Sequence, residues 1–106
     1  MRTKEIQVKA TAGRPYGHVP GHHYHDVDVW IQRSANSRWF VTVLETWGSC
    51  QGRDEEHGRH QICGRGKSLD DAQAQAERLA QAAGINQEYL AQALSQAASE
   101  AEELMD

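Results

Sequence analysis

The spacing of apolar residues in this 106-residue chain changes at Ser68. Before Ser68, apolar and polar side chains alternate in short segments, which is typical of β-strands with one buried face. After Ser68, apolar residues recur three, four and seven positions apart, as they do on one face of an α-helix. The length suits one domain with a modest core. We therefore predict a single α+β domain over residues 1–106, with strands within 3–66 and helices within 69–105.

Four segments of the first part are predicted strands. Residues 38–47 have the strongest signal, because aromatic and β-branched side chains dominate them. Residues 34–37 have turn chemistry, which predicts a hairpin with the segment before them. Residues 13–22 contain both prolines and three glycines and are expected to form a loop. The predicted strands are residues 4–12, 23–33, 38–47 and 59–63.

Two alanine-rich helices are predicted after the strands. Ser68 is a suitable N-cap, since its hydroxyl can accept a hydrogen bond from an amide of the first turn. The helix is expected to end at Ala83, because Gly84 favours a left-handed C-cap. Asn86 can cap a second helix, whose apolar stripe continues to Met105. We expect both helices to pack on one face of an antiparallel sheet of three to four strands.

The register of the predicted hairpin decides which side chains share a face of the sheet. A four-residue loop places Arg33 opposite Arg38. The valines and Ile31 of residues 23–33 then share the helix-covered face with Phe40, Thr42 and Leu44. Val41 and Val43 fall on the opposite face. We predict that the rest of this second face binds a ligand or a partner, through Tyr24, Asp26, Asp28, Trp30, Trp39, Glu45 and Trp47.

A helix-free face with three tryptophans is larger than the apolar patches that soluble monomers usually expose. Two interpretations remain open. Another part of the same chain covers the tryptophans, so that they belong to the core. Alternatively, a second copy covers them across a twofold axis. We favour the homodimer, because a small domain with a thin alanine core gains stability by association.

The same register places two carboxylates, Asp26 and Glu45, directly opposite each other. Like charges in this position destabilise a sheet unless they are neutralised. Neutralisation can come from Arg59 or Arg65 on the next strand, from a shared proton, or from a bound cation. Carboxylates beside tryptophans also suit a cationic or sugar-like ligand. An ordinary solvated or arginine-paired rim is the simpler interpretation.

All six histidines lie either in residues 18–25 or in residues 57–60. An alternative function is therefore that of a metal-binding or metal-dependent protein, with a zinc or nickel site built from His and Cys residues together with Asp26, Asp28 or Glu45. The chain has no CxxC pair and no HExxH motif. Clustered imidazoles also fit a pH-sensitive loop. No catalytic residue is predicted, because Cys50 and a nearby histidine lack a third member and an oxyanion-hole signature. The candidate metal ligands are His23, His25, His57, His60 and Cys63.

A nucleic-acid-binding sheet module is a second alternative. The order of strands, turns and a helix over residues 26–83 resembles, in outline, the AP2-type and integrase arm-binding DNA-binding domains. This resemblance implies that Arg38 and Trp39 read a DNA groove. The net charge of −4 argues against it. Residues 1–67 hold ten Lys and Arg against seven Asp and Glu, whereas residues 68–106 hold one Arg against eight acids, which would repel phosphates.

The leading hypothesis is a small, non-enzymatic binding or protein-interaction module that acts as a homodimer. No apolar run approaches the roughly 18 residues that cross a bilayer, so no membrane partner is expected. The N-terminal sequence lacks the pattern of a secretory signal. We therefore expect a cytoplasmic protein with Cys50 and Cys63 reduced, and no small-molecule ligand is indicated by a motif.

Overall fold

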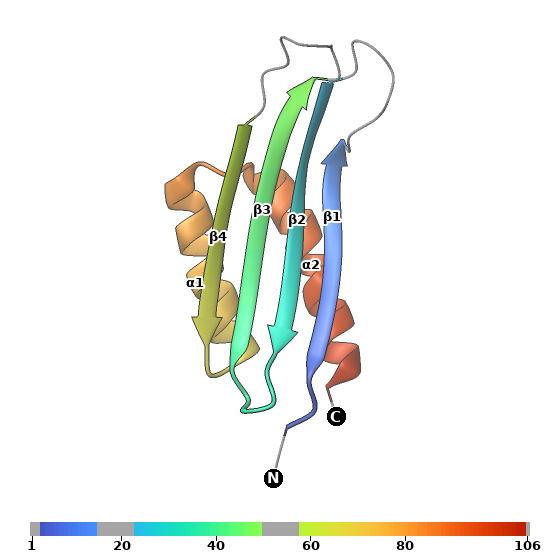
Figure 1. Ribbon diagram of the computed structural model, residues 1–106, viewed down its shortest axis with the longest axis vertical. Coiled ribbons are helices and arrows are strands. Elements are labelled where there is room, and N and C mark those ends of the chain that lie inside the picture. Colours follow the sequence, from blue (N-terminus) through green and yellow to red (C-terminus); the bar gives the residue numbers. More distant parts are fainter. Residues whose placement is uncertain (1–2, 15–22, 50–57, 106) are drawn as a thin grey trace.

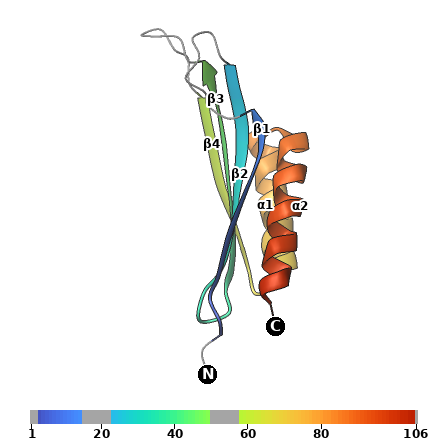
Figure 2. The ribbon, with the colours of Figure 1, turned by 90° about the vertical axis from the view of Figure 1, so that its right-hand side faces the viewer.

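A computed structural model describes residues 3–14, 23–49 and 58–105. They form an antiparallel four-stranded sheet followed by two helices, which confirms the predicted α+β fold. The strands lie side by side in chain order, and both helices cover one face, so the other face is open (Figures 1 and 2). The elements are β1 (Ile6–Arg14), β2 (His23–Arg33), β3 (Trp39–Ser49), β4 (Gly58–Gly66), α1 (Leu69–Ala83) and α2 (Gln87–Leu104).

The core lies between the sheet and the helices. Alternate residues of the two central strands point into it, and Val27, Val29, Val41 and Val43 are completely buried there. β-Branched side chains suit these positions because they pack well on a pleated surface. Helix α1 lies on β3 and β4, and α2 lies on β1 and β2. Neither helix, within the described part of the chain, is long and apolar enough to cross a membrane.

Small residues on both sides bring α1 close to β4. Ala72, Ala76 and Ala80 of α1 are completely buried against the sheet. Opposite them, a Cβ atom added at Gly64 would lie 2.4 Å from the carbonyl oxygen of Ala72 and 2.5 Å from the amide nitrogen of Ala76. Gly66 is similarly close to the first turn of α1. The backbone of α1 therefore packs directly on the backbone of β4 at Gly64 and Gly66, which have no side chains.

The helix boundaries confirm the predicted caps. The Ser68 hydroxyl accepts a hydrogen bond from the amide of Asp71 at 3.1 Å. Gly84 follows α1 with a left-handed φ of 78°, which glycine adopts without steric cost. The Asn86 side chain accepts a hydrogen bond from the amide of Tyr89 at 2.9 Å, and α2 begins at the next residue after this cap. Each helix start thus has a side-chain acceptor for one of its free amides.

The hairpin between β2 and β3 differs from the predicted one by one residue. Ser34 donates its amide to the carbonyl of Arg38 at 2.9 Å, so only three residues form the loop. Ser37 closes it with a left-handed φ of 65°, as in three-residue hairpins that end in a bulge. Arg33 consequently pairs with Trp39 instead of Arg38. A shift of one residue moves every β3 side chain to the other face of the sheet.

We expect Gly64→Ala to lower the free energy of unfolding by about 2 kcal/mol, because the new methyl group would push against the α1 backbone. Gly84→Ala is the matched control. No atom lies within 4 Å of its added Cβ, so it loses only the about 1 kcal/mol that a left-handed residue costs. Chemical denaturation of both variants measures the difference. Equal losses would contradict the close packing of α1 on β4.

Candidate functional site

The predicted ligand or partner face is divided between the two faces of the sheet. Three of its members, Trp39, Glu45 and Trp47, lie on the helix side, because the observed register pairs them with odd-numbered residues of β2. The other four members lie on the open face. Trp39 is only 4% exposed and belongs to the core. The grouping of seven residues on one face was therefore wrong, as was the expectation that Trp39 is available to a DNA groove. The residues on the open face are Tyr24, Asp26, Asp28 and Trp30.

The predicted opposition of two carboxylates is also corrected by the register. Asp26 pairs with Thr46, whose hydroxyl donates to its carboxylate at 2.6 Å. Asp28 accepts from the hydroxyl of Thr11 at 2.5 Å. Each aspartate thus has a neutral donor on a neighbouring strand, and neither lies opposite Glu45.

Glu45 is the one buried charged residue in the described ranges, at 3% exposure. One carboxylate oxygen, Oε2, lies 2.7 Å from Nε2 of His25 and accepts the backbone amide of Asn86 at 2.9 Å. The other oxygen, Oε1, lies 3.0 Å from Nδ1 of His60. We call this arrangement the His25–Glu45–His60 site. It joins three strands of the sheet to the residue that caps α2.

Hydrogen bonding to Glu45 assigns the protons of both imidazoles. An ionised carboxylate only accepts hydrogen bonds, so Nε2 of His25 and Nδ1 of His60 must each carry a proton. The remaining ring nitrogens carry lone pairs whenever the rings are neutral. The two side chains are 38% and 41% exposed, so solvent reaches both rings.

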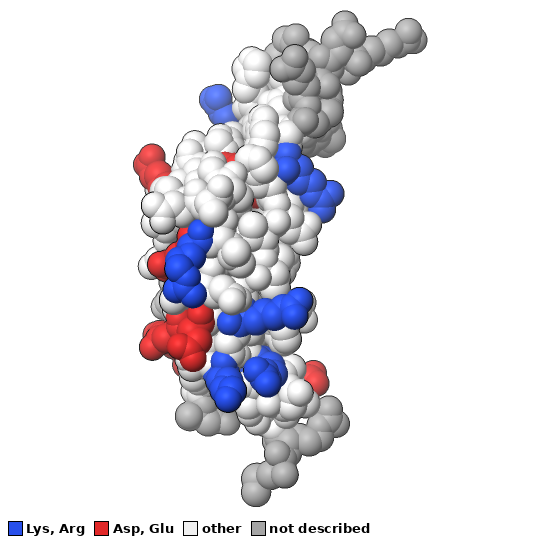
Figure 3. Space-filling model, turned by 90° about the vertical axis from the view of Figure 1, so that its left-hand side faces the viewer, with Lys and Arg blue, Asp and Glu red and all other residues white. Residues whose placement is uncertain are grey.

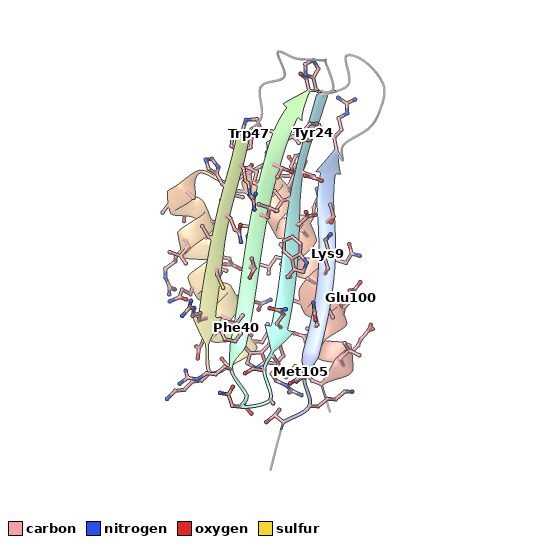
Figure 4. All side chains as sticks on the ribbon, viewed as in Figure 1. Lys9, Tyr24, Phe40, Trp47, Glu100 and Met105 are labelled. Atoms are coloured by element: carbon pink, nitrogen blue, oxygen red, sulfur yellow. The ribbon has the colours of Figure 1, made fainter. Side chains whose placement is uncertain are left out.

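Aromatic side chains surround the two imidazoles near the end of the sheet that also holds Tyr24 (Figure 4). The Trp47 ring centroid lies 4.8 Å from that of His60 and 6.2 Å from that of His25, and Tyr89 contacts His25 at 5.2 Å. Trp47 occupies the space over Gly58, where a Cβ atom would lie 1.8 Å from the indole. A glycine is therefore required opposite Trp47.

Two opposing effects act on the pKa of Glu45. Burial raises it, but hydrogen bonds from His25, the Asn86 amide and His60 lower it more, so the net pKa lies below the ordinary value of 4.5. The carboxylate is therefore ionised at neutral pH, and its charge is satisfied by three donors. Chemically, the site holds two oriented imidazoles and links the sheet to the start of α2.

The five predicted metal ligands are not brought together. His25 and His60 share the carboxylate of Glu45, but Cys63 points to the open face, where its sulfur lies 3.6 Å from the Thr42 hydroxyl. His23 is exposed in the first position of β2. His57 and Cys50 are outside the residues that the structure describes. In the described ranges, no three His, Cys, Asp or Glu side chains form a group that could hold a metal ion.

The open face has an aromatic and aliphatic centre, of which the sequence placed Trp30 correctly but Phe40 and Leu44 on the helix side. Trp30, Phe40 and Leu44 are half-buried on β2 and β3, and no described element covers them (Figures 1 and 2). The Lys9 ammonium lies 5.1 Å from the Trp30 ring centroid. A shallow hollow of about 310 Å³ is lined by Trp30, Gln32, Thr42, Leu44, Arg59 and Gln61.

Comparison with known proteins assigns no relative, since no family model, curated protein or solved structure matches the chain.

We expect Glu45→Gln to lower the free energy of unfolding at pH 7 by about 1.5 to 3 kcal/mol, the range for hydrogen bonds to a charged group. A lowered pKa stabilises the fold above pH 4.5, and this contribution is lost as pH falls through the folded-state pKa. The wild type should therefore lose stability more steeply than the variant below about pH 5.

Urea denaturation between pH 7 and pH 3 measures this difference. Glu77→Gln is the control, because Glu77 is exposed on α1 and should retain the wild-type pH profile. Parallel profiles for wild type and Glu45→Gln would show that the Glu45 charge does not stabilise the fold.

Proposed function

We propose that the protein is a small, non-enzymatic interaction module that acts as a cytoplasmic homodimer, joined through the open face of its sheet. The observation that supports it is the uncovered centre formed by Trp30, Phe40 and Leu44. A sheet with helices on one side normally presents polar side chains on the other. Here two aromatic rings and a leucine occupy the central strands instead.

The composition of the open face suits an interface between proteins. Interface centres are enriched in aromatic residues and arginine, and their rims are polar. The open face follows this order, because its aromatic centre is bordered by Gln32, Gln61 and Arg59. The proposal therefore keeps the predicted partner surface but replaces its composition: one tryptophan contributes to it rather than three.

The His25–Glu45–His60 site supports a non-enzymatic interpretation. Both oxygens of Glu45 are occupied by donors, and one of these donors is the backbone amide of Asn86. Removing the carboxylate from this arrangement would break the hydrogen bond between the sheet and Asn86, the residue that caps α2. We therefore assign the site a structural role, which is to hold the helix layer in place.

The expected mass in solution is that of two chains. Trp30→Lys combined with Phe40→Lys should weaken association at least about 30-fold, because central aromatic residues contribute about 2 kcal/mol or more each and the new charges would repel. Light scattering coupled to size-exclusion chromatography measures the mass over a dilution series, and circular dichroism verifies the fold.

Leu79→Lys is the matched control. Leu79 is 40% exposed on the helix side, so its replacement should not change the mass. A wild-type chain that remains a monomer at the highest concentration tested would refute the homodimer. A dimer that Leu79→Lys dissociates, and the open-face variant does not, would place the interface on the helices.

A further inference from the structure

Arginine and aspartate side chains of the open face lie on different strands. Arg59 and Arg65 are exposed on β4, whereas Asp26 and Asp28 lie on β2. Seen from the β4 side, Lys and Arg side chains gather along this edge of the sheet, and Asp and Glu side chains gather beside them on the helix side (Figure 3). Lys9, on β1, is already engaged with the Trp30 ring.

The paired residues of the four strands define rows across the open face. One row contains Gly13, Asp26, Thr46 and Arg59, from β1 to β4. The basic and the acidic member of this row are two strands apart, roughly 10 Å, given the spacing of neighbouring strands. Within one chain, Arg59 instead donates a hydrogen bond to Gln61 at 3.1 Å.

Two copies can meet face to face about a twofold axis that runs either across the strands or along them. An axis across the strands places β4 on the second copy's β4. Arg59 and Arg65 of the two copies then lie close to one another, and these like charges repel. An axis along the strands, between β2 and β3, places β4 over β1 and β3 over β2 instead. The row that contains Asp26 then lies over the same row of the second copy, with its order from β1 to β4 reversed.

The axis along the strands brings Arg59 of each copy close to Asp26 of the other. Arg59 of one copy lies over the exposed Gly13 of the other, at the edge strand β1, so its guanidinium group is directed at the row that holds Asp26. Asp26 pairs with Gly13 on the neighbouring strand, so its carboxylate is within reach of the Arg59 guanidinium group of the other copy. The Thr46 hydroxyl uses one oxygen of Asp26, and a carboxylate has further acceptor positions for an arginine.

The same axis also joins the apolar centres of the two copies. Gln32 pairs with Phe40 and Trp30 pairs with Thr42 in one chain. Phe40 of the second copy therefore lies over Gln32, next to Trp30, and the arrangement is reciprocal. Aromatic pairs in such contact stabilise an interface. The face spans roughly 19 by 30 Å, or about 1,200 Å² for both copies, which is the lower end of stable interfaces.

We propose that two copies pair through their open faces about a twofold axis parallel to the strands, with Arg59 of each copy bound to Asp26 of the other. This inference rests on the proposed homodimer and adds its geometry and its specificity-determining charges. Because Arg59 and Asp26 are at the rim of the aromatic centre, they select this orientation over the one in which arginines meet.

Reversing each charge separately tests the pairing. Arg59→Asp and Asp26→Arg should each weaken self-association at least about 30-fold, because like charges then face each other twice in the dimer. An equimolar mixture should form a heterodimer within about fivefold of the wild-type affinity, since both pairs again have opposite signs. Native mass spectrometry with one chain isotopically labelled distinguishes heterodimer from homodimer. Arg78→Asp, an exposed reversal on α1, is the control and should not change association.

Chemical cross-linking tests the axis without charge reversal. Cys63 of one copy should lie over Lys9 of the other, because Lys9, Trp30, Thr42 and Cys63 form one row. In a Cys50→Ser background, Lys9→Cys should give a covalent dimer with a bis-maleimide spacer of about 8 to 10 Å, close to the spacing of packed sheets. The background chain alone should give none. Within one chain the two thiols are three strands apart, roughly 14 Å, which is too far for this spacer.

The outcomes separate this inference from the proposed function. A monomeric wild type overturns both. A wild-type dimer that needs Trp30 and Phe40, but is insensitive to the charge reversals or not restored by mixing, overturns only the axis. Cross-linking of the background chain through Cys63 alone would place β4 against β4 and would also overturn the axis. Restored heterodimer together with a Lys9→Cys cross-link supports it.

Discussion

The left-handed conformation of Ser37 determines which residues of this protein are inside and which are outside. It closes a three-residue hairpin loop and so pairs Arg33 with Trp39. Because side chains alternate along a strand, this one backbone angle places Trp39 and Glu45 under the helices and leaves Phe40 and Leu44 on the open face. The core, the His25–Glu45–His60 site and the open-face centre all follow from it.

Glu45 shows how a charged residue can occupy the buried side of a sheet. Glu45 lies on the same face of β3 as the buried Val41 and Val43. Its carboxylate is reached there by two imidazoles and by the Asn86 amide. Burying a charge without partners is costly, whereas a carboxylate with three donors retains its ionisation. The bond to Asn86 gives the helix layer a fixed contact with the sheet at the turn between α1 and α2.

The architecture could be predicted from the sequence, but the faces of β3 could not. Alternation in the strands and the capping residues Ser68, Gly84 and Asn86 are local signals, and the structure has the elements they indicate. The hairpin register depends on Ser37, a residue type that gives little sign of a left-handed angle, whereas glycine or asparagine would have suggested one. All three members of the His25–Glu45–His60 site were named as candidates, but His25 and His60 as metal ligands and Glu45 as part of the ligand or partner face, because their meeting depends on that register. The signal that could have revealed the site is the spacing of Glu45, which lies two and four residues after Val43 and Val41 and therefore shares their face of β3.

The arrangement in which α2 returns along β1 has a practical consequence for handling the protein. The two chain ends emerge at one end of the molecule, and the His25–Glu45–His60 site lies towards the other (Figures 1 and 4). Affinity tags, fluorophores or a fused protein attached to either end would therefore be held away from Glu45 and its two imidazoles. A circular permutant that joins the two ends through a short linker is also compatible with this geometry, since such rearrangements succeed where chain ends are close and exposed.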